Sequence, residues 1–463
     1  MKIYNTLSRK VEEFIPHDGN NVSFYTCGPT VYHDQHIGNM RNYIGHDILD
    51  KTLRYLGYNV TRVMNITDVG HLTSDSDSGD DKMVKSAKEK NKTVMEIAKY
   101  YTDEFFKDFE SLNNRKPDIV SPATNHIKDY IKIIGSLLEK GYAYKSGGNV
   151  YFDVSKLDDY YKLTNHKEDD MVVGAREGVS YDDSKRNQAD FALWFTKSKF
   201  DAQDLKWESP FGLGYPGWHI ECSGISIHYL GEYLDIHGGG VDNIFPHHTN
   251  EIAQSESYLG HKWCNYWFHN EHLMDETGKM SKSKGATLTI SLLKEKGYNP
   301  LAFRYMCLTS HYRKQIVFSF ENLDGAANAY NKLINKVKAL RENGNLDSKL
   351  YNTYDSKFKD ELSNDLNTSN VITLVYDLLK DDTINSTTKI ELLKNWDKVL
   401  SLDLFKEEKI DNDLKKYVEE MILKRKLAKE NKNYEEADKI RQELLDNGIE
   451  IKDTREGVVW NKI

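Results

Sequence analysis

Residues 235–251 read DIHGGGVDNIFPHHTNE, and the rest of the chain can be interpreted outward from this stretch. It holds three histidines, three consecutive glycines and several carboxylates. His247 and Glu251 are four residues apart, so a helix would place both side chains on one face, one turn from each other. An imidazole and a carboxylate arranged in this way make half of the donor set of a zinc site.

The other half of such a site must be soft, and the chain has only four cysteines. Cys27 ends an apolar run just before a Gly-Pro-Thr turn, and Cys222 lies in the stretch GWHIECSG. Two alternatives remain open from the residues alone: a single cysteine can be an inert buried hydrophobe, and a His/Glu pair at this spacing can lie on a solvated helix face. We predict one zinc ion per chain, held by four side chains: Cys27, Cys222, His247 and Glu251.

Length and composition favour a large protein with real cores. At 463 residues with 39% hydrophobic side chains, roughly three domains of about 150 residues are expected. The start, MKIYNTLSRKVEEF, carries charges where a signal peptide needs an apolar run. No apolar stretch approaches the ~20 residues that span a membrane, and four cysteines without a disulfide pattern fit a reducing compartment. We therefore expect a cytoplasmic protein with no membrane partner.

The net charge of −9 argues against a protein that coats nucleic acid indiscriminately, because phosphate neutralisation needs local lysine and arginine. Whole-chain charge does not exclude a local basic surface. One basic cluster lies near the C-terminus and is either a solvated helix face or a surface that faces RNA; it comprises Lys424, Arg425, Lys426 and Lys429.

The N-terminal region predicts a βαβ unit. Residues 22–27 read as a short buried strand, residues 44–56 repeat apolar side chains at helical spacing, and residues 59–66 read as a second strand. This order indicates a parallel sheet. Ligands of such sheets bind at the carboxyl ends of the strands, where Cys27 and Thr67 both fall.

Two stretches have the chemistry of nucleotide binding. The predicted helix begins near HIGN, residues 36–39, where free N–H groups and the helix dipole suit an anion. Gly38 would let a ligand approach the backbone closely, and His36 and Asn39 can add donors. Residues 278–285, GKMSKSKG, place three lysines and two serines between glycines, as a cationic loop for a triphosphate would. An ordinary helix cap and an exposed linker are the alternatives.

Together these stretches resemble one family. HIGN, KMSKS and a parallel nucleotide-binding sheet resemble the class I aminoacyl-tRNA synthetases. The fuller blocks narrow the resemblance to the cysteinyl-tRNA synthetase family, in that family's order: YTCGPTVYHDQHIGN, NITDVG, GYPGWHIECS, DIHGGGVDNIFPHHTNEIAQSE and GKMSKSKG, with NDLNTS and the ending DTREGVVW further on. The match covers essentially the whole chain.

The resemblance implies an α/β fold: a class I synthetase Rossmann-like parallel sheet domain with an insertion, then a helical bundle and a small C-terminal anticodon-side domain. Changes in composition suggest where these parts begin and end. We expect the first half of the catalytic domain in residues 1–112, a connective insertion in 113–206, the second half with the KMSKS loop in 207–310, the helical bundle in 311–403 and the anticodon-recognition domain in 404–463.

The resemblance also implies an activity: ATP-dependent activation of L-cysteine to cysteinyl-adenylate, followed by transfer to the 3′-terminal ribose of tRNA(Cys). We expect a monomer that uses ATP with Mg²⁺. Catalytic roles fall to His36, Asn39, Lys279 and Lys282. Contacts to ATP fall to Thr30, His36, Gly38, Asn39, Gly239, Asp242 and Lys282. Thr67 and Trp218 would line the pocket for cysteine, and the family's zinc ligands match the four side chains proposed above.

Zinc would explain how cysteine is selected over serine, which differs only by oxygen for sulfur. A pocket that reads shape alone discriminates such pairs by roughly 10–200-fold, whereas translation needs ~10⁴ or more. A soft metal that binds the thiolate rejects the hard hydroxyl by bond chemistry.

One position departs from the class motif, which ends in histidine where this chain has Asn39. Asparagine keeps a donor but cannot become cationic, so the strength of transition-state stabilisation is in question. Two other functions remain open. A paralogous ATP-dependent ligase that joins cysteine to a small amine would not need residues 311–463. A non-catalytic RNA-binding relative has Asn39 as its only support.

Overall fold

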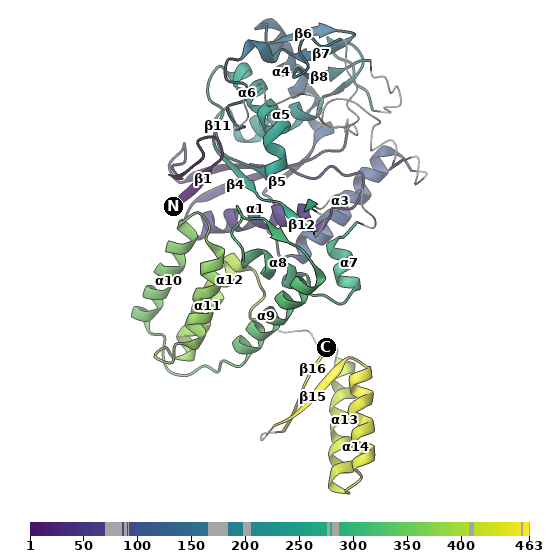
Figure 1. Cartoon of the computed structure of the whole chain (residues 1–463), viewed down its shortest axis with the longest axis vertical. Helices are drawn as coiled ribbons and strands as arrows, with labels where there is room; N and C mark the ends of the chain where they lie inside the picture. The colour runs from purple at the N-terminus through teal and green to yellow at the C-terminus, as the bar shows by residue number, and fades with distance from the viewer. Residues whose placement is uncertain are drawn as a thin grey trace. The chain divides into compact units, whose positions relative to one another are not determined.

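A computed structural model describes most of the chain, in two compact units that we treat separately, Met1–Leu404 and Phe405–Ile463 (Figure 1). No helix in the part of the chain that it covers is long and apolar enough to cross a membrane. The described residues are 1–69, 86–87, 90, 92–164, 184–197, 205–275, 278–279, 287–406, 412–454 and 457–462.

A five-stranded parallel sheet forms the centre of the first unit, and its neighbouring strands run in the same direction throughout. The helix α1 (Ile37–Tyr55) crosses from β3 to β4, as the sequence predicted. The α/β fold is thereby confirmed. In spatial order the strands are β11 (Cys264–Asn270), β10 (Leu234–Gly240), β3 (Asn21–Thr26), β4 (Asn59–Ile66) and β5 (Ile119–Pro122).

Helices cover both faces of this sheet, because successive side chains of a strand point to opposite sides. Tyr25 and Val63 belong to the apolar cluster formed with α4 (Ile127–Glu139), α5 (Trp218–Leu230) and α6 (Thr249–Leu259). Their neighbours Phe24 and Arg62 face α1, where the ring of Phe24 lies edge-on to that of His46. Figure 1 shows α4, α5 and α6 above the sheet and α1 below it.

A second, four-stranded antiparallel sheet lies beyond α4 and α5. It comprises β6 (Ala143–Ser146), β7 (Asn149–Phe152), β8 (Phe191–Phe195) and β9 (Tyr215–Pro216), in that order. The segment predicted as the insertion, 113–206, does not coincide with this sheet. It includes β5, which joins β4 in the central sheet, and it stops before β9. β5 and β9 are very short and lie in polar sequence, so the sequence pattern did not predict the sheets to which they belong.

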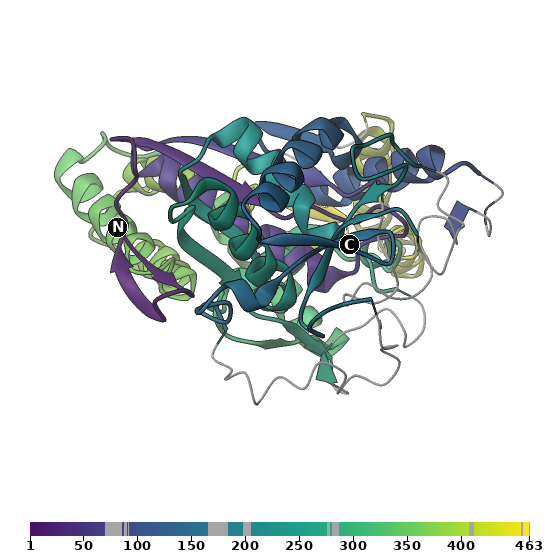
Figure 2. The ribbon, with the colours of Figure 1, turned by 90° about the horizontal axis from the view of Figure 1, so that it is seen from above.

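Several further elements complete the first unit, and Figure 2 shows the ribbon from above. They are β1 (Lys2–Asn5), β2 (Lys10–Glu13), α3 (Val94–Ser111), the 3₁₀ turns Ala123–His126 and Val154–Lys156, β12 (Leu273–Asp275), β13 (Gly278–Lys279), α7 (Ile290–Glu295), α8 (Pro300–Leu308), β14 (Ile316–Val317), α9 (Phe320–Lys338), α10 (Ser348–Ser363), α11 (Thr368–Lys380) and α12 (Ser386–Leu400). The last four helices form a bundle in which Trp396 stacks on Phe358 with ring centroids 4.8 Å apart.

The second unit pairs two helices with a two-stranded hairpin: α13 (Asn412–Glu430), α14 (Tyr434–Asp446), β15 (Ile449–Thr454) and β16 (Gly457–Lys462). Its core includes Val418, Leu444 and Ile451. Arg425, predicted as part of a basic surface, is instead buried and donates two hydrogen bonds to Asp453, at 2.8 and 2.9 Å. A guanidinium fork matches a carboxylate so well that this arginine fastens the hairpin to α13.

A buried ion pair joins the sheet to the helical bundle inside the first unit. The guanidinium of Arg304, on α8, donates to Asp47 of α1 at 2.7 Å, and both side chains are fully buried. The same guanidinium donates to the carbonyls of Leu400 and Leu112 at 2.7 and 3.0 Å. Burial opposes ionisation of Asp47, yet Lys51 and Arg304 together hold its pKa below the ordinary value.

Replacing Arg304 by methionine should destabilise the protein by about 3–5 kcal/mol, because it leaves buried acceptors without their donor. Urea unfolding followed by tryptophan fluorescence measures the change. The matched control is Arg341→Met, on an exposed arginine, which should stay within about 0.5 kcal/mol of the parent. Equal stability of the two variants would show that the buried pair does not hold the parts together.

Candidate active site

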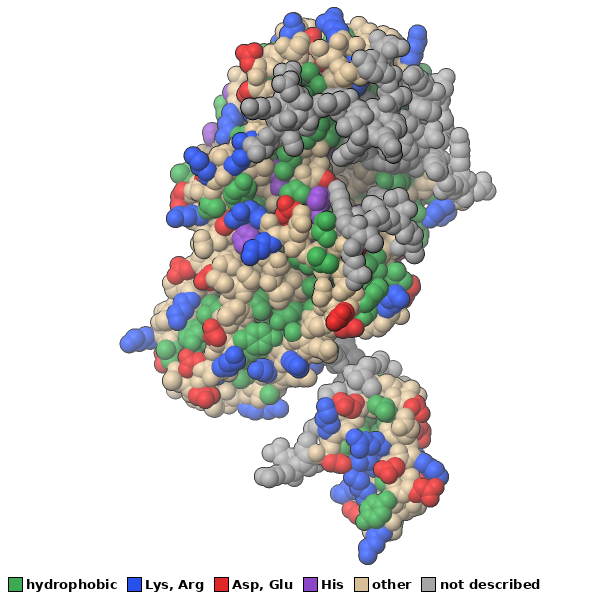
Figure 3. All heavy atoms as spheres, in the orientation of Figure 1, with side chains coloured by type: hydrophobic (Ala, Val, Ile, Leu, Met, Phe, Trp, Pro, Cys, Tyr) green, Lys and Arg blue, Asp and Glu red, His purple; other side chains and the backbone are tan. Residues whose placement is uncertain are grey.

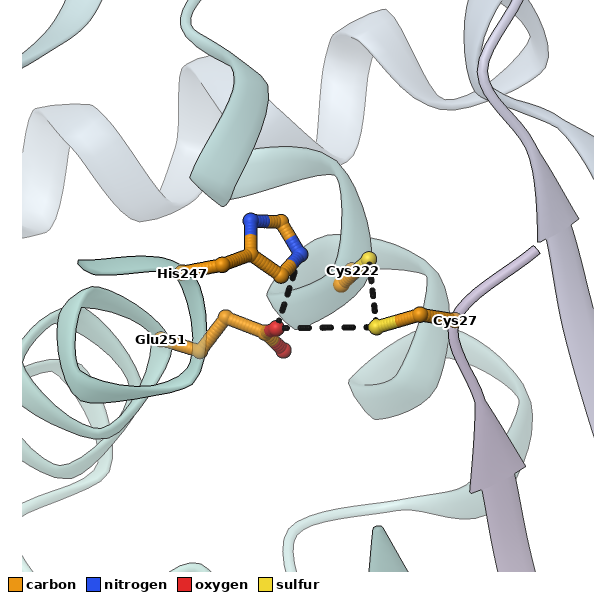
Figure 4. Close-up of side chains that lie close together, drawn as sticks. All are labelled: Cys27, Cys222, His247 and Glu251. Atoms are coloured by element: carbon orange, nitrogen blue, oxygen red, sulfur yellow. Dashed lines mark hydrogen bonds and ion pairs between the residues drawn. The ribbon is translucent and has the colours of Figure 1, made fainter. Parts of the chain in front are cut away.

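The four predicted metal ligands come together above the carboxyl end of the central sheet (Figure 4). Cys27 directly follows β3, and Cys222 lies on α5. His247 lies in the wide helical turn Ile244–His248, which runs into α6, where Glu251 follows one turn later. All four side chains are buried, and their donor atoms lie within 4.8 Å of one another.

The distances between these donors suit a tetrahedral ion. The two sulfur atoms of Cys27 and Cys222 are 3.8 Å apart, and the sulfur of Cys27 is 4.0 Å from Glu251 Oε1. His247 Nε2 is 3.1 Å from the same Oε1. In a tetrahedral zinc site, bonds of about 2.0–2.3 Å place neighbouring donors about 3.3–3.8 Å apart. The sulfur–sulfur distance falls in this range and the other two distances lie about 0.2 Å outside it, so the donors are spaced nearly as a zinc ion requires.

Ionisation in the cluster follows from its burial. Burial raises the pKa of the Cys27 thiol, and burial together with Cys27 raises the pKa of Cys222. Burial opposes a charge on His247, but Glu251 and Cys222 raise its pKa to about 10. Burial likewise opposes a charge on Glu251, but His237 and His247 lower its pKa to about 2. Since the thiolate is the ligand form, metal binding here would release thiol protons.

Two histidines that the sequence analysis left without a role adjoin the same cluster. His248 Nε2 lies 3.3 Å from the sulfur of Cys27, and His237 Nε2 lies 2.8 Å from Glu251 Oε2. With Cys27 and Glu251 they form a second buried group whose donors are also within 4.8 Å of one another. The sequence signal was present, since both belong to the stretch 235–251, but spacing alone could not rank them against His247.

A chain of imidazoles surrounds the cluster. His248 Nδ1 contacts His269 Nε2 at 2.8 Å, and His219 Nδ1 contacts His247 Nδ1 at 3.0 Å. Burial lowers the pKa of His219, His248 and His269, so these rings are neutral near pH 7. A neutral ring next to a metal ligand orients that ligand through the hydrogen bond between them.

The two residues predicted for the cysteine pocket lie next to the cluster. The ring of Trp218, at the start of α5, is 4.2 Å from the ring of His247. Thr67, just after β4, donates its hydroxyl to Glu221 Oε2 at 2.9 Å and accepts from Asn65 at 3.1 Å. Glu221 was not predicted; it is fully buried, and burial raises its pKa. A carboxyl group beside Cys222 was visible in the sequence, but not its contact with Thr67.

The HIGN residues form the start of α1, as predicted. The Nδ1 of His36 accepts the backbone N–H of Asn39 at 3.2 Å and so caps the helix. A Cβ at Gly38 would lie 2.9 Å from the His36 ring, so the cap itself requires glycine. The Oδ1 of Asn39 is buried with no hydrogen-bond partner among the described residues. Thr30, predicted to contact ATP, pairs through an isolated parallel bridge with Thr67, predicted to contact cysteine.

The glycine run of β10 has a packing reason in addition to any ligand. A Cβ at Gly239 would lie 2.5 Å from the ring of His248. Asp242 follows in the turn Val241–Asn243, with about half of its side chain exposed (54%) and its Oδ1 4.0 Å from His272 Nδ1. Both positions lie at the carboxyl end of β10, beside the end of β3 that carries Cys27.

The lysine loop is only partly described. The backbone of Lys279 belongs to β13, which pairs with β12 opposite Met274. Lys282, predicted to contact ATP, lies outside the described residues. The structure therefore describes the predicted metal ligands, the predicted cysteine pocket and the HIGN residues. The contacts of Lys279 and Lys282 with ATP stay predictions.

Comparisons with known proteins agree with this arrangement. Residues 13–328 match the family described as tRNA synthetases class I (C) catalytic domain. Among solved structures, the fold of the chain is similar to that of methionyl-tRNA synthetase from Mycobacterium tuberculosis, with a TM-score of 0.52, 14% identity, and coverage of 82% of this chain and 90% of that one. The parallel sheet with its HIGN helix is thus the catalytic fold of a class I tRNA synthetase.

Two curated relatives narrow the class. A cysteine–tRNA ligase from Treponema denticola is 45% identical over the full length of both chains. One from Borreliella burgdorferi is 42% identical and covers 99% of this chain and 98% of its own. The chain belongs to the cysteine–tRNA ligase family.

The purified protein should hold one divalent metal ion per chain at this four-residue cluster, and Cys222→Ser should remove most of that ion, because a hydroxyl is a poor substitute for a thiolate. Elemental analysis after dialysis measures this. Cys307→Ser is the control, since Cys307 is also buried but lies outside both clusters. Full metal content in Cys222→Ser would favour the second group, with His237 and His248 as ligands.

Proposed function

We propose that this chain is a cysteine–tRNA ligase that uses a zinc-bound pocket to choose its amino acid. The reaction joins L-cysteine to ATP, forming cysteinyl-adenylate and diphosphate, and then moves the cysteinyl group to the 3′-terminal ribose of tRNA(Cys). The single observation that carries the proposal is the meeting of two thiols, an imidazole and a carboxylate at one buried point. Membership of the family supports the same activity.

Cys27, Cys222, His247 and Glu251 would hold the zinc. When bound, zinc supplies a soft Lewis acid that prefers the thiolate of cysteine to the hydroxyl of serine. Trp218, whose ring packs on His247, would close the pocket beside the sulfur. Glu251 is the one hard ligand of the four and the one we expect to loosen when the substrate enters. Its Oε2 is held by His237 at 2.8 Å, so the carboxylate stays in place whether or not Oε1 is a ligand.

In the first step the carboxylate of cysteine attacks the α-phosphorus of ATP, a P–O bond forms, and the bond to diphosphate breaks. No protein nucleophile is required, so catalysis consists of positioning and of stabilising charge on phosphate oxygens. The free N–H groups and positive dipole end of α1 would serve one side, with His36 and Asn39 as side-chain donors. Lys279 and Lys282 would serve the other, with Mg²⁺ on the triphosphate.

In the second step the 2′-hydroxyl of the terminal ribose attacks the carbonyl of the adenylate, and AMP leaves as the ester forms. Adenosine would lie along the glycine run of β10, with Asp242 near its ribose. The end of β10 is next to the end of β3 in the sheet, so the two halves of the adenylate would lie over neighbouring strands. The helical bundle and the compact second unit favour a tRNA over a small amine as the acceptor.

Cysteine-dependent ATP–diphosphate exchange tests the first step. The parent should catalyse the exchange, and Cys222→Ser should lower the exchange rate by at least about 100-fold. This loss exceeds the 10–100-fold that follows when only the neighbours of a metal ligand are changed. Cys307→Ser should keep the parent's rate. Charging of tRNA(Cys) with cysteine and serine offered together should then give only the cysteinyl ester. A normal exchange rate in Cys222→Ser would mean that the metal does not select cysteine over serine.

Substitutions of Asn39 test the proposed role of the start of α1 without changing a metal ligand. Asn39→Ala should lower the exchange rate by about 10²–10³-fold with little change in the KM for cysteine, because it removes a donor used mainly in the transition state. Asn39→His should keep most of the activity, since histidine restores a donor there. An unchanged rate in Asn39→Ala would mean that the side chain does not contact the phosphates.

A further inference from the structure

A third group of side chains that could hold a metal ion lies where α4 begins and α5 ends. Its members are His126, Asp129 and His228, and their donor atoms lie within 4.8 Å of one another. His126 ends the 3₁₀ turn Ala123–His126, Asp129 is in the first turn of α4, and His228 is in the last turn of α5. Figure 1 shows these two helices side by side above the sheet.

The two imidazoles aim the same nitrogen at the same oxygen. Nδ1 of His126 lies 2.9 Å from Asp129 Oδ2, and Nδ1 of His228 lies 3.1 Å from that atom. His126 is only 3% exposed, and its other nitrogen contacts Ser121 Oγ at 2.8 Å. Ser121, itself buried, therefore fixes the His126 ring with Nδ1 turned towards the carboxylate. A ligating histidine is commonly oriented in this way through its second nitrogen.

The electrostatic setting suits a cation on balance. The last carbonyls of α5 favour positive charge, whereas the first turn of α4 disfavours it. Asp129 stands on that first turn and supplies a compensating negative charge. The side chains of Asp129 and His228 are 34% and 46% exposed, so an ion could reach them from solvent and keep waters in its remaining positions.

We propose that His126, Asp129 and His228 form a second divalent metal site, with zinc as its ion. Bonds of about 2.0–2.1 Å place neighbouring donors about 2.9–3.4 Å apart, from octahedral to tetrahedral geometry, which matches both observed distances. Two imidazoles and one carboxylate suit zinc, cobalt or nickel and do not suit magnesium or calcium. A bound ion fastens the end of α5 to the start of α4. Because α5 also carries Trp218 and Cys222, the ion steadies the helix on which the cysteine pocket is built.

The alternative is a pair of hydrogen bonds with no ion, in which both Nδ1–H groups donate to Asp129. The two cases differ in what zinc does to the full-length protein. Starting from protein with its thiolate site filled, a Zn²⁺ titration by calorimetry should reveal one additional ion per chain. His228→Gln and Asp129→Asn, both on partly exposed side chains, should each lower the affinity for this ion by at least about 10-fold. His261→Gln, on a histidine elsewhere on the surface, is the matched control and should bind as the parent does.

Two further measurements identify the site. Additional Zn²⁺ should raise the thermal midpoint of the parent and of His261→Gln, and should leave that of His228→Gln unchanged, because an ion stabilises only the state that binds it. Co²⁺ added in place of the second ion should show no sulfur-to-cobalt charge-transfer band, in contrast to Co²⁺ at the two cysteines. The proposal is overturned if the parent binds no additional ion, if His228→Gln and Asp129→Asn bind it as tightly as the control, or if the second Co²⁺ shows thiolate absorption.

Discussion

The proposed site depends on the approach of two sulfur atoms, from Cys27 and Cys222, that are 195 residues apart in the chain and 3.8 Å apart in space. Two buried thiols gain little from each other, because each is a weak donor and burial raises the pKa of both. Their approach makes sense as half of a metal site, with His247 and Glu251 as the other half. The parallel sheet makes it possible, since β3 ends where α5 and α6 cross above the strands.

The start of α1, where we propose that ATP binds, and the proposed metal ligands share one framework. The start of α1 carries the HIGN residues, and the middle of α1 carries Asp47, which Arg304 ties to α8 and to the end of α12. The glycines of β10 leave room for the imidazoles of His46 and His248, which pack where side chains would otherwise stand. These buried rings pack on the two faces of the sheet, His46 on the side of α1 and His248 on the side of the ligands, and Figure 3 shows small patches of histidine at the surface of the face in view.

Much of this could be predicted from the sequence. Strand and helix periodicity from residue 22 to residue 66 was strong enough to define β3, α1 and β4, and the four proposed ligands were found from residue chemistry before any fold was known. The positions of β5 and β9 could not be predicted, because strands of four and two residues carry almost no periodic signal. Neither could the second donor group, since only the folded chain places His248 beside Cys27. Arg425 was misjudged because a basic run says nothing about the carboxylate, Asp453, that pairs with it.

X-ray absorption at the zinc edge tests the central claim most directly, because it counts the sulfur atoms bound to the ion. The account predicts two sulfur ligands in the protein alone, from Cys27 and Cys222, and a third when L-cysteine is added, with no change when L-serine is added instead. In protein that carries one zinc ion per chain, an ion without sulfur ligands, or a sulfur count that cysteine leaves unchanged, would contradict it.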